Sequence, residues 1–181
     1  MNHLATSKED ILAASRDLIK ENGWAAVSIR AVASRCSVSA GTIYNYYESK
    51  ADLLSDTIES IWHEIFFHPE DEQIFHDVES CISWIYERLE YGNRQFPGFF
   101  SLHSFGFMRD EKTSGKKRMM KTWGHILNGL CEVLENDPKV RADVFDQEFT
   151  EKKFADILFS LILVSMIRQD YDPSSVLMLV K

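Results

Sequence analysis

The sequence predicts an all-α protein, in which an N-terminal three-helix helix-turn-helix domain is joined by a long fourth helix to a larger helical domain. Apolar residues recur at spacings of three and four along most of the chain, which is the helical period. The short amphipathic segment 28–38 is followed at once by 39–50, and so tight a break favours a helix-turn-helix. Strand-type alternation, glycine-rich phosphate loops and internal repeats are not evident.

The composition indicates a folded protein outside the membrane. The chain has 181 residues, of which 45% are hydrophobic and 12% aromatic, enough to bury a substantial core. It contains no run of roughly 18 uninterrupted apolar residues, and residues 1–6 are too short and polar for a signal peptide. We therefore expect a cytoplasmic protein with no membrane partner.

The charge is distributed unevenly along the chain. The net charge of −8 opposes nucleic-acid binding, which draws affinity from cations that meet phosphates. Residues 1–50, however, hold six basic and five acidic groups, a net charge of +1, so the remaining residues carry −9. This asymmetry fits an N-terminal nucleic-acid face on an acidic body.

No pattern in the sequence is typical of an enzyme or a metal site. The three cysteines are far apart and lack CxxC spacing, which predicts reduced thiols: Cys36, Cys81 and Cys131. His63 and Glu64 lie near His68 and Glu72, but the histidines form no i, i+4 pair. We expect no metal, no cofactor and no catalytic residues, since a nucleophile–base pattern is also missing.

Capping residues define the first three helices. Ser7 to Asp10 has the form of a capping box, and Asn22–Gly23 supplies a left-handed end to that helix. Ser28 caps a second helix of about two turns. Ser39 caps a third helix, 39–47, in which Ile43 and Tyr47 share the buried side.

A second capping box, Ser49 to Asp52, opens the fourth helix. Its apolar residues follow the helical spacing i, i+4, i+7 and i+11: Leu54, Ile58, Ile61 and Ile65. The domains are predicted as 1–52 and 53–181. Three further helices should follow, with apolar stripes at 74–89, 119–134 and 154–167.

The helix at 154–167, capped by Thr150, is apolar on nearly every face. Such a helix must be buried all round. One solution in a chain of this size is to place one face on the core and the other on a second subunit.

The first sixty or so residues resemble the N-terminal domain of the TetR family of bacterial transcription regulators. The matching positions are Ile11, Ala14, Leu18, Gly23, the segment 28–33, Val38, Ser39, the segment 41–44, Tyr47, Ser49, Lys50, Leu53 and Leu54. The resemblance implies a DNA-binding head followed by a divergent helical domain for ligand binding and dimerisation. Ser37 departs from the family, which usually has a turn glycine there.

The resemblance implies that helix 39–47 enters the major groove of a double-stranded DNA operator. The expected DNA contacts are Ser28, Arg30, Ser39, Ala40, Gly41, Thr42, Tyr44, Asn45, Tyr46 and Lys50. Tyr44 and Lys50 match phosphate-binding residues of the family, whereas Asn45 is our first choice for reading a base. Gly41 permits close approach of the backbone either to DNA or to the second helix.

The second domain is expected to hold an effector pocket and a dimer interface. Candidate pocket residues are Trp62, Phe66, Trp84, Phe100, Phe105, Met108 and Trp123. Candidate interface residues are Ile126, Leu130, Phe154, Leu158, Leu161, Ile162 and Ser165. Alternatively, the aromatic residues belong simply to the core.

The resulting expectation is a homodimeric repressor that binds a palindromic operator and is released by a small apolar or aromatic effector. Because the residues after position 50 are acidic, a cationic effector is the alternative to an apolar one. Two alternatives remain within the family, activation instead of repression and control by a protein partner. A third, an all-helical enzyme or carrier, would need convergent titratable groups in a pocket.

Overall fold

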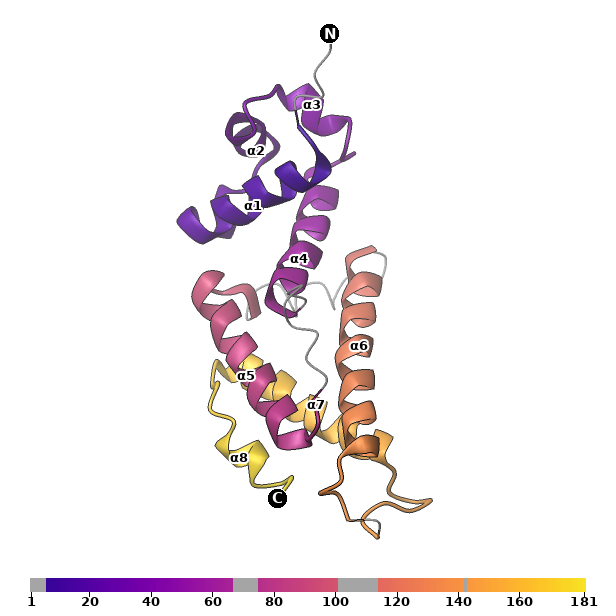
Figure 1. Cartoon of the computed structure of the whole chain (residues 1–181). Helices are drawn as coiled ribbons and strands as arrows, with labels where there is room; N and C mark the ends of the chain where they lie inside the picture. Colours follow the sequence, from indigo (N-terminus) through magenta and orange to yellow (C-terminus); the bar gives the residue numbers. More distant parts are fainter. Residues whose placement is uncertain (1–5, 67–74, 101–113, 142) are drawn as a thin grey trace. The chain divides into compact units, whose positions relative to one another are not determined.

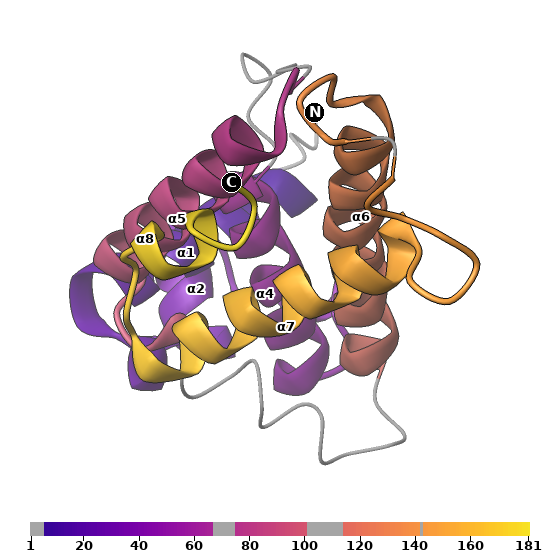
Figure 2. The same cartoon turned by 90° about the horizontal axis from the view of Figure 1, so that it is seen from below.

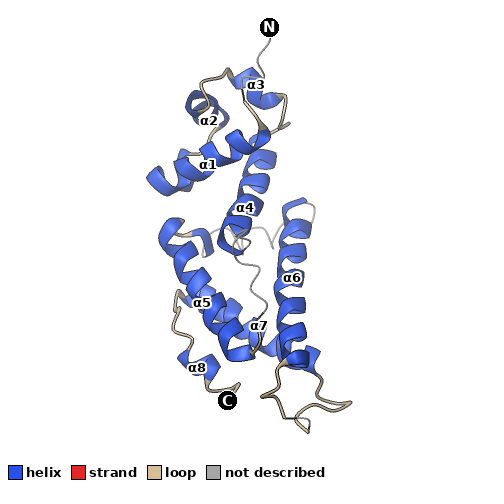
Figure 3. Ribbon diagram, viewed as in Figure 1, coloured by secondary structure: helices blue, strands red, loops and turns tan. Residues whose placement is uncertain are grey.

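A computed structural model describes residues 6–66, 75–100, 114–141 and 143–181 (Figure 1). These residues form eight α-helices and one 3-10 helix, and they contain no strand (Figure 3). The predicted all-α class is therefore confirmed. No helix within the described ranges is long and apolar enough to cross a membrane. The chain divides into two compact units, residues 1–64 with 95–97 and residues 65–94 with 98–181.

Unit 1 begins with α1, Lys8–Asn22, whose ends are those expected from its capping residues. The Ser7 hydroxyl accepts from the Asp10 amide at 3.1 Å, and the Asp10 carboxylate accepts from the Ser7 amide at 2.8 Å. Gly23 ends the helix with a φ of 75°, in the left-handed region. A 3-10 turn, Trp24–Ala26, then leads to the second helix.

The helix-turn-helix consists of α2, Ile29–Arg35, and α3, Ala40–Tyr44. The turn is a Schellman motif, in which the Val38 amide donates to the Ala33 carbonyl and the Ser37 amide to the Ser34 carbonyl. Ser37 has a φ of 56°, so the serine adopts the left-handed conformation that the family usually gives to glycine.

We expect Ser37→Gly to stabilise the protein. Relief of the left-handed strain outweighs the added entropy of the unfolded chain, so the free energy of unfolding should rise by about 0.5–1 kcal/mol. The same change at Ser34, a helical position of α2, should instead lower it by about 0.5 kcal/mol. Urea unfolding followed by circular dichroism measures both, and a destabilised Ser37→Gly variant would contradict the strain argument.

The third helix is shorter than predicted. It ends at Tyr44 rather than at residue 47, because Asn45 and Tyr46 form a tight turn. Their backbone amides donate hydrogen bonds to the carbonyls of Thr42 and Ile43, respectively. Ile43 and Tyr47 are nevertheless buried, at 0% and 4% exposure, so the expected inward side is confirmed.

Helix α4, Lys50–Phe66, runs from unit 1 into unit 2. Ser49 caps it by accepting from the Asp52 amide at 3.2 Å. Two ion pairs join α4 to α1, between Lys8 and Asp56 at 2.6 Å and between Lys20 and Glu64 at 2.6 Å. Because these contacts extend along α4, unit 1 reaches residue 64, beyond the domain boundary expected from the sequence after residue 52.

Unit 2 is built from α5, Val78–Gln95, α6, Ser114–Asn136, α7, Glu151–Arg168, and α8, Ser174–Leu177. Helix α5 starts four residues later than its predicted apolar stripe because Asp77 accepts from the Ser80 amide at 2.7 Å and caps it. Helix α7 packs on α6 (Figure 2). The hydroxyl of Tyr86 on α5 shares a hydrogen bond with the hydroxyl of Ser165 on α7, at 2.8 Å.

Candidate nucleic-acid interface and pocket

Serine caps organise the starts of α2, α3 and α4. The hydroxyl of Ser28 accepts from the Ala31 amide at 3.1 Å, and that of Ser39 accepts from the Thr42 amide at 3.2 Å. Ser39 and Thr42 also share a bond between their hydroxyls at 3.0 Å. The caps leave other backbone amides of each first turn for an anion, which the helix dipole favours.

The end of α3 presents large side chains to solvent. Tyr44 is 55% exposed, although its ring is mostly apolar, and Asn45 at the helix end is exposed as well. An exposed amide has its two donors and its acceptor available for a base edge. Ala40 and Thr42 are half-buried on the same short helix.

Gly41 is exposed and is not required by packing. A Cβ built on it meets only the Ser39 hydroxyl, at 3.6 Å, which is ordinary contact. Of the two explanations for this glycine, close helix packing is therefore not supported, while close approach to DNA remains a prediction.

We expect Gly41→Ala to leave stability unchanged or raise it, by up to about 1 kcal/mol, since alanine favours a helix. If the backbone approaches DNA here, the same methyl group should weaken operator binding about 10-fold or more, equivalent to ~1.4 kcal/mol. Gly124→Ala in α6, where an added Cβ meets nothing within 4 Å, is the matched control. Fluorescence anisotropy with an operator duplex measures affinity, and unchanged affinity in Gly41→Ala would exclude the close approach.

The Tyr46 hydroxyl has a partner inside the domain. It donates to the carbonyl of Thr6 at 2.7 Å and thereby fixes the chain just before α1 beside the end of α3. Tyr46 thus has a structural role, and its DNA contact stays a prediction.

Most cations of the N-terminal domain are neutralised by carboxylates. Lys8 pairs with Asp56, Arg16 with Glu9 and Glu64, and Lys20 with Glu64. Arg35 pairs with Glu21 at 2.5 Å, a hydrogen bond that lowers the pKa of the Glu21 carboxyl.

Arg30 and Lys50 differ from these four. Both are exposed, and neither forms an ion pair with any residue that the structure describes. They stand in the first turns of α2 and α4, where a cation opposes the helix dipole unless an anion joins it. In the described part of unit 1, the positive charge available to a phosphate is therefore concentrated on Arg30 and Lys50. Both residues are among the DNA contacts predicted from the sequence.

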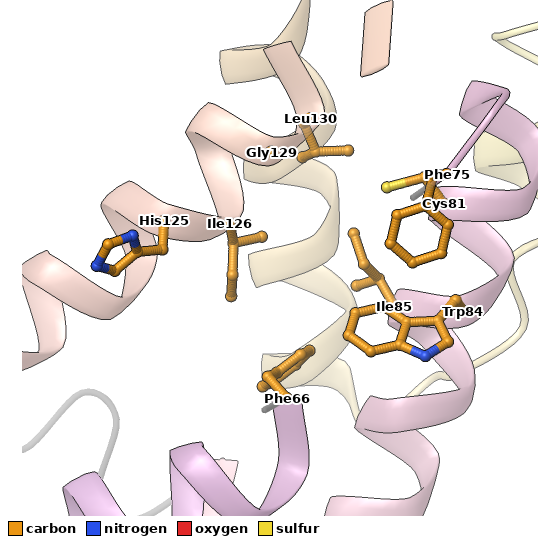
Figure 4. Close-up of a pocket in the computed structure, with 9 residues that line it drawn as sticks. All are labelled: Phe66, Phe75, Cys81, Trp84, Ile85, His125, Ile126, Gly129 and Leu130. Atoms are coloured by element: carbon orange, nitrogen blue, oxygen red, sulfur yellow. The ribbon is translucent and has the colours of Figure 1, made fainter. Parts of the chain in front are cut away.

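Unit 2 contains a pocket of about 160 Å³. Its lining comes from the end of α4, the start of α5 and the middle of α6: Phe66, Phe75, Cys81, Trp84, Ile85, His125, Ile126, Gly129 and Leu130 (Figure 4). The Trp84 ring contacts those of Phe66 and Phe75, at centroid distances of 6.0 and 5.2 Å. The imidazole of His125 points away from the other side chains (Figure 4).

The pocket is apolar and offers no permanent charge. Burial raises the pKa of the Cys81 thiol to about 12, so this side chain is a neutral part of the wall. A ligand that fits must gain affinity from apolar contact and ring stacking rather than from ion pairing.

The structure brings together only part of the predicted pocket. Phe66 and Trp84 line it, while Phe105 and Met108 lie outside the described residues. Trp62, Phe100 and Trp123 are buried at 2%, 0% and 9% exposure and are not part of this lining, so their place in a pocket stays a prediction. Trp123 packs on Phe159 instead, and Phe100 on Phe99 and Tyr171.

Sequence reasoning did not place seven of the nine lining residues in the pocket. Ile126 and Leu130 were expected at the dimer interface, and five were not singled out for either site: Phe75, Cys81, Ile85, His125 and Gly129. A signal for two of them was present, since Cys81 and Ile85 are four apart in the apolar stripe that also carries Val78 and Leu89. Whether such a stripe faces a core or a pocket depends on the neighbouring helices, so the stripe alone did not identify them.

The predicted dimer interface stays a prediction, although most of its residues have contacts within the single chain. Leu130, Leu158 and Ile162 are buried at 1%, 0% and 2% exposure within a single chain, so they belong to its core. Ile126 lines the pocket, Phe154 packs on Phe145 and Phe149, and Ser165 bonds Tyr86. Only Leu161, which is half-buried, lies toward the exposed side of α7.

The exposed face of α7 is apolar. Ile157, Val164 and Ile167 are 46%, 43% and 51% exposed, and with Leu161 they follow the helical spacing. This face, here called the α7 stripe, is left uncovered by the described residues of a single chain.

In the described part of the chain, no three His, Cys, Asp or Glu side chains are grouped so that they could hold a metal ion. Glu64 is engaged by Arg16 and Lys20. His68 and Glu72 lie outside the described residues.

Comparison with known proteins identifies the N-terminal domain. Residues 11–57 match the family model described as "Bacterial regulatory proteins, tetR family". The HTH-type transcriptional regulator UidR of Escherichia coli (strain K12) is 38% identical over 48 residues. That match covers 26% of this chain and 24% of UidR, about a quarter of each.

Solved structures with the same fold cover nearly the whole chain. A TetR transcription regulator from Haloarcula marismortui has a TM-score of 0.69 at 17% identity, over 93% of this chain and 94% of that one. A transcriptional regulator from Rhodococcus sp. Rha1 has a TM-score of 0.66 at 19% identity, over 93% and 86%. FadR from Bacillus subtilis, solved with stearoyl-CoA, has a TM-score of 0.59 at 16% identity, over 93% and 88%. Residues 11–57 thus carry the N-terminal domain of the TetR family of bacterial regulatory proteins, and the whole chain shares the fold of solved regulators of this kind.

Proposed function

We propose that the protein is a homodimeric transcriptional repressor that binds a palindromic operator and is released by a small uncharged ligand. Helix α3 enters the major groove, Asn45 reads a base, and Tyr44, Thr42 and Lys50 hold phosphates. The observation that carries the proposal is the charge pattern of unit 1. Four of its cations are paired with carboxylates, while Arg30 and Lys50, at the starts of α2 and α4, have no such partner among the described residues.

The dimer is part of this proposal. One helix-turn-helix head contacts too little DNA for tight specific binding, whereas two heads related by a twofold axis read half-sites roughly 35 Å apart. The α7 stripe supports an isologous interface, because a twofold axis brings the same exposed apolar residues of two chains together.

The pocket supports a ligand the size of a single aromatic ring. Its volume of about 160 Å³ compares with the ~150 Å³ apolar cavity that holds benzene in another protein. The stearoyl-CoA bound by FadR is far larger than this. A ligand releases DNA if it binds better to the conformation in which the two heads no longer match the half-sites.

The function is tested with duplexes from the region upstream of the protein's own gene. We expect saturable binding to a palindromic segment, two chains per duplex by sedimentation, and weaker binding when the half-site spacing is changed by five base pairs. Absence of any preferred duplex would contradict the proposal, and transcription that rises with added protein would make it an activator. Saturating toluene should raise the melting temperature, and no shift would remove the pocket from the proposal.

A further inference from the structure

We propose that four residues, at the start of α5 and just after the end of α6, set the width of the pocket and so limit it to ligands of a single aromatic ring. They are here called the α5–α6 clasp: Asp77, Val78, Asp137 and Lys139. The inference rests on the proposed function, which supplies the ligand. The start of α5 and the end of α6 lie at the same end of unit 2, where the clasp joins them (Figure 1).

Asp137, which directly follows the last residue of α6, is the centre of the clasp. Its Oδ2 accepts a hydrogen bond at 2.8 Å from the amide of Val78, the first residue of α5. Its Oδ1 accepts from the amide of Lys139 at 2.8 Å, which fixes the direction of the carboxylate. The residue is only 8% exposed, and a carboxylate is buried at an acceptable cost only where hydrogen bonds replace its water. The first turn of α5 is therefore capped in part by a residue from beyond α6.

A second contact of the clasp runs in the opposite direction. Nζ of Lys139 lies 3.2 Å from Oδ2 of Asp77, whose Oδ1 accepts from the amide of Ser80. Hydrogen bonds from Ser80 and from Lys139 lower the pKa of Asp77 to about 2, so this carboxylate is charged at neutral pH. Each of the two segments thus donates to a carboxylate of the other.

The clasp stands close to the pocket on both helices. Cys81 of the lining lies three residues after Val78 on α5. Leu130 of the lining lies seven residues before Asp137 on α6. Because a helix rises 1.5 Å per residue, these lining residues are ~5 Å and ~10 Å along the helix axes from the clasp. Two helices joined at one end separate along the lining only by bending or by pivoting about that end.

The walls of the pocket do not define its width as sharply as the clasp does. The side chains that α5 and α6 direct toward each other across the pocket are apolar (Figure 4). Apolar contact is not directional, whereas a hydrogen bond requires a narrow range of distances. The clasp therefore sets the separation of the two helices, and the volume of about 160 Å³ that results leaves room for one ring.

The test compares two uncharged probes, toluene with one ring and naphthalene with two. The full-length wild type should bind toluene about 10-fold more tightly or better, since a misfit of one methylene in an apolar pocket is worth ~10- to 200-fold. Asp137→Ala removes the bond to Val78 and lets α5 move away from α6, so the preference for toluene should fall by about 10-fold. Isothermal titration calorimetry measures both affinities, and circular dichroism confirms that each variant is folded.

The ratio of the two affinities separates this role from a merely structural one. A variant that is partly unfolded loses apparent affinity for both probes by the same factor, because only its folded fraction binds. The ratio then stays at the wild-type value, whereas a wider pocket changes it.

Two further variants grade the effect. Asp137→Asn keeps an oxygen that accepts from Val78, so it should retain most of the preference for toluene. Lys139→Met removes the ion pair with Asp77 but leaves the bond between Asp137 and Val78. Because Lys139 is 64% exposed and such pairs contribute little, this variant should lower the preference less than Asp137→Ala does.

Asp146→Ala is the matched control. Asp146 lies in the same connection between α6 and α7 and also accepts from two backbone amides, those of Glu148 at 2.8 Å and Phe149 at 2.7 Å. Both amides belong to its own turn rather than to α5. The ratio of affinities should therefore remain that of the wild type.

The proposed role of the clasp is overturned if Asp137→Ala keeps the wild-type ratio, shifts it toward toluene, or shifts it no more than Asp146→Ala does. A crystal structure of ligand-free Asp137→Ala gives a second measurement. Along the lining, α5 and α6 should stand ~1–2 Å further apart, the scale of helix shifts in proteins, and an unchanged distance would overturn the role as well. If the wild type binds neither probe, the ligand class of the proposed function fails, while this distance still decides whether the clasp sets the width.

Discussion

Val164→Asp is expected to dissociate the proposed dimer and to reduce operator affinity by about 100-fold or more, because two linked heads gain roughly 10²- to 10⁴-fold over one. Val164 is 43% exposed in the middle of the α7 stripe, between Leu161 and Ile167. At a twofold interface, one substitution places two carboxylates near each other in an apolar contact. Their burial makes the free energy of dimer formation less favourable by ~3–5 kcal/mol. The single chain loses little, since the side chain is not in its core.

Val144→Asp is the matched control. Val144 is 37% exposed, close to the exposure of Val164, but it lies in the segment between α6 and α7. Size-exclusion chromatography with light scattering measures the mass of each variant, and anisotropy measures operator affinity. If Val164→Asp remains dimeric with unchanged affinity, the interface lies elsewhere on the chain.

Local signals in the sequence predicted the first unit well. Ser7, Ser28 and Ser39 cap helices where expected, because a capping hydroxyl is satisfied by an amide only two or three residues away. The positive φ of Ser37 was expected, because this serine stands where the TetR family usually has a turn glycine. The end of α3 was placed three residues too late, since the 3.6 period alone does not separate a helical residue from the turn that follows it.

Features set by tertiary packing were predicted less well. In α7, apolar residues occur on every side, so the sequence did not show which face turns inward. Leu158 and Ile162 were expected at a dimer interface, but they are buried within the single chain, while Ile157 and Val164 are exposed. The pocket depends on how α5 and α6 face each other, so Trp84 was found, but Cys81 and His125 were not.

Asn45→Ala and Lys50→Gln should weaken operator binding in two distinguishable ways. An asparagine bonded to an adenine contributes ~1–3 kcal/mol of discrimination, so Asn45→Ala should lower operator affinity by roughly 5- to 150-fold. Affinity for unrelated DNA and the dependence on salt should stay the same, because this contact releases no counterion. Asn45 is exposed at the end of α3, and its loss should leave circular dichroism unchanged.

Lys50→Gln should weaken binding to operator and to unrelated DNA by the same factor. Each lost phosphate contact lowers the slope of log affinity against log salt by about 0.9, so a dimer that loses two should show a slope smaller by ~1.8. Arg35→Gln is the decisive control, since Arg35 is already neutralised by Glu21 at 2.5 Å and should leave the slope unchanged. Arg35→Gln could instead alter the slope as much as Lys50→Gln does. In that case, ion pairing with carboxylates does not decide which cations of unit 1 contact phosphates. If only Lys50→Gln alters the slope, the cation at the start of α4 contacts DNA, whereas Arg35 is withheld from DNA by its carboxylate partner.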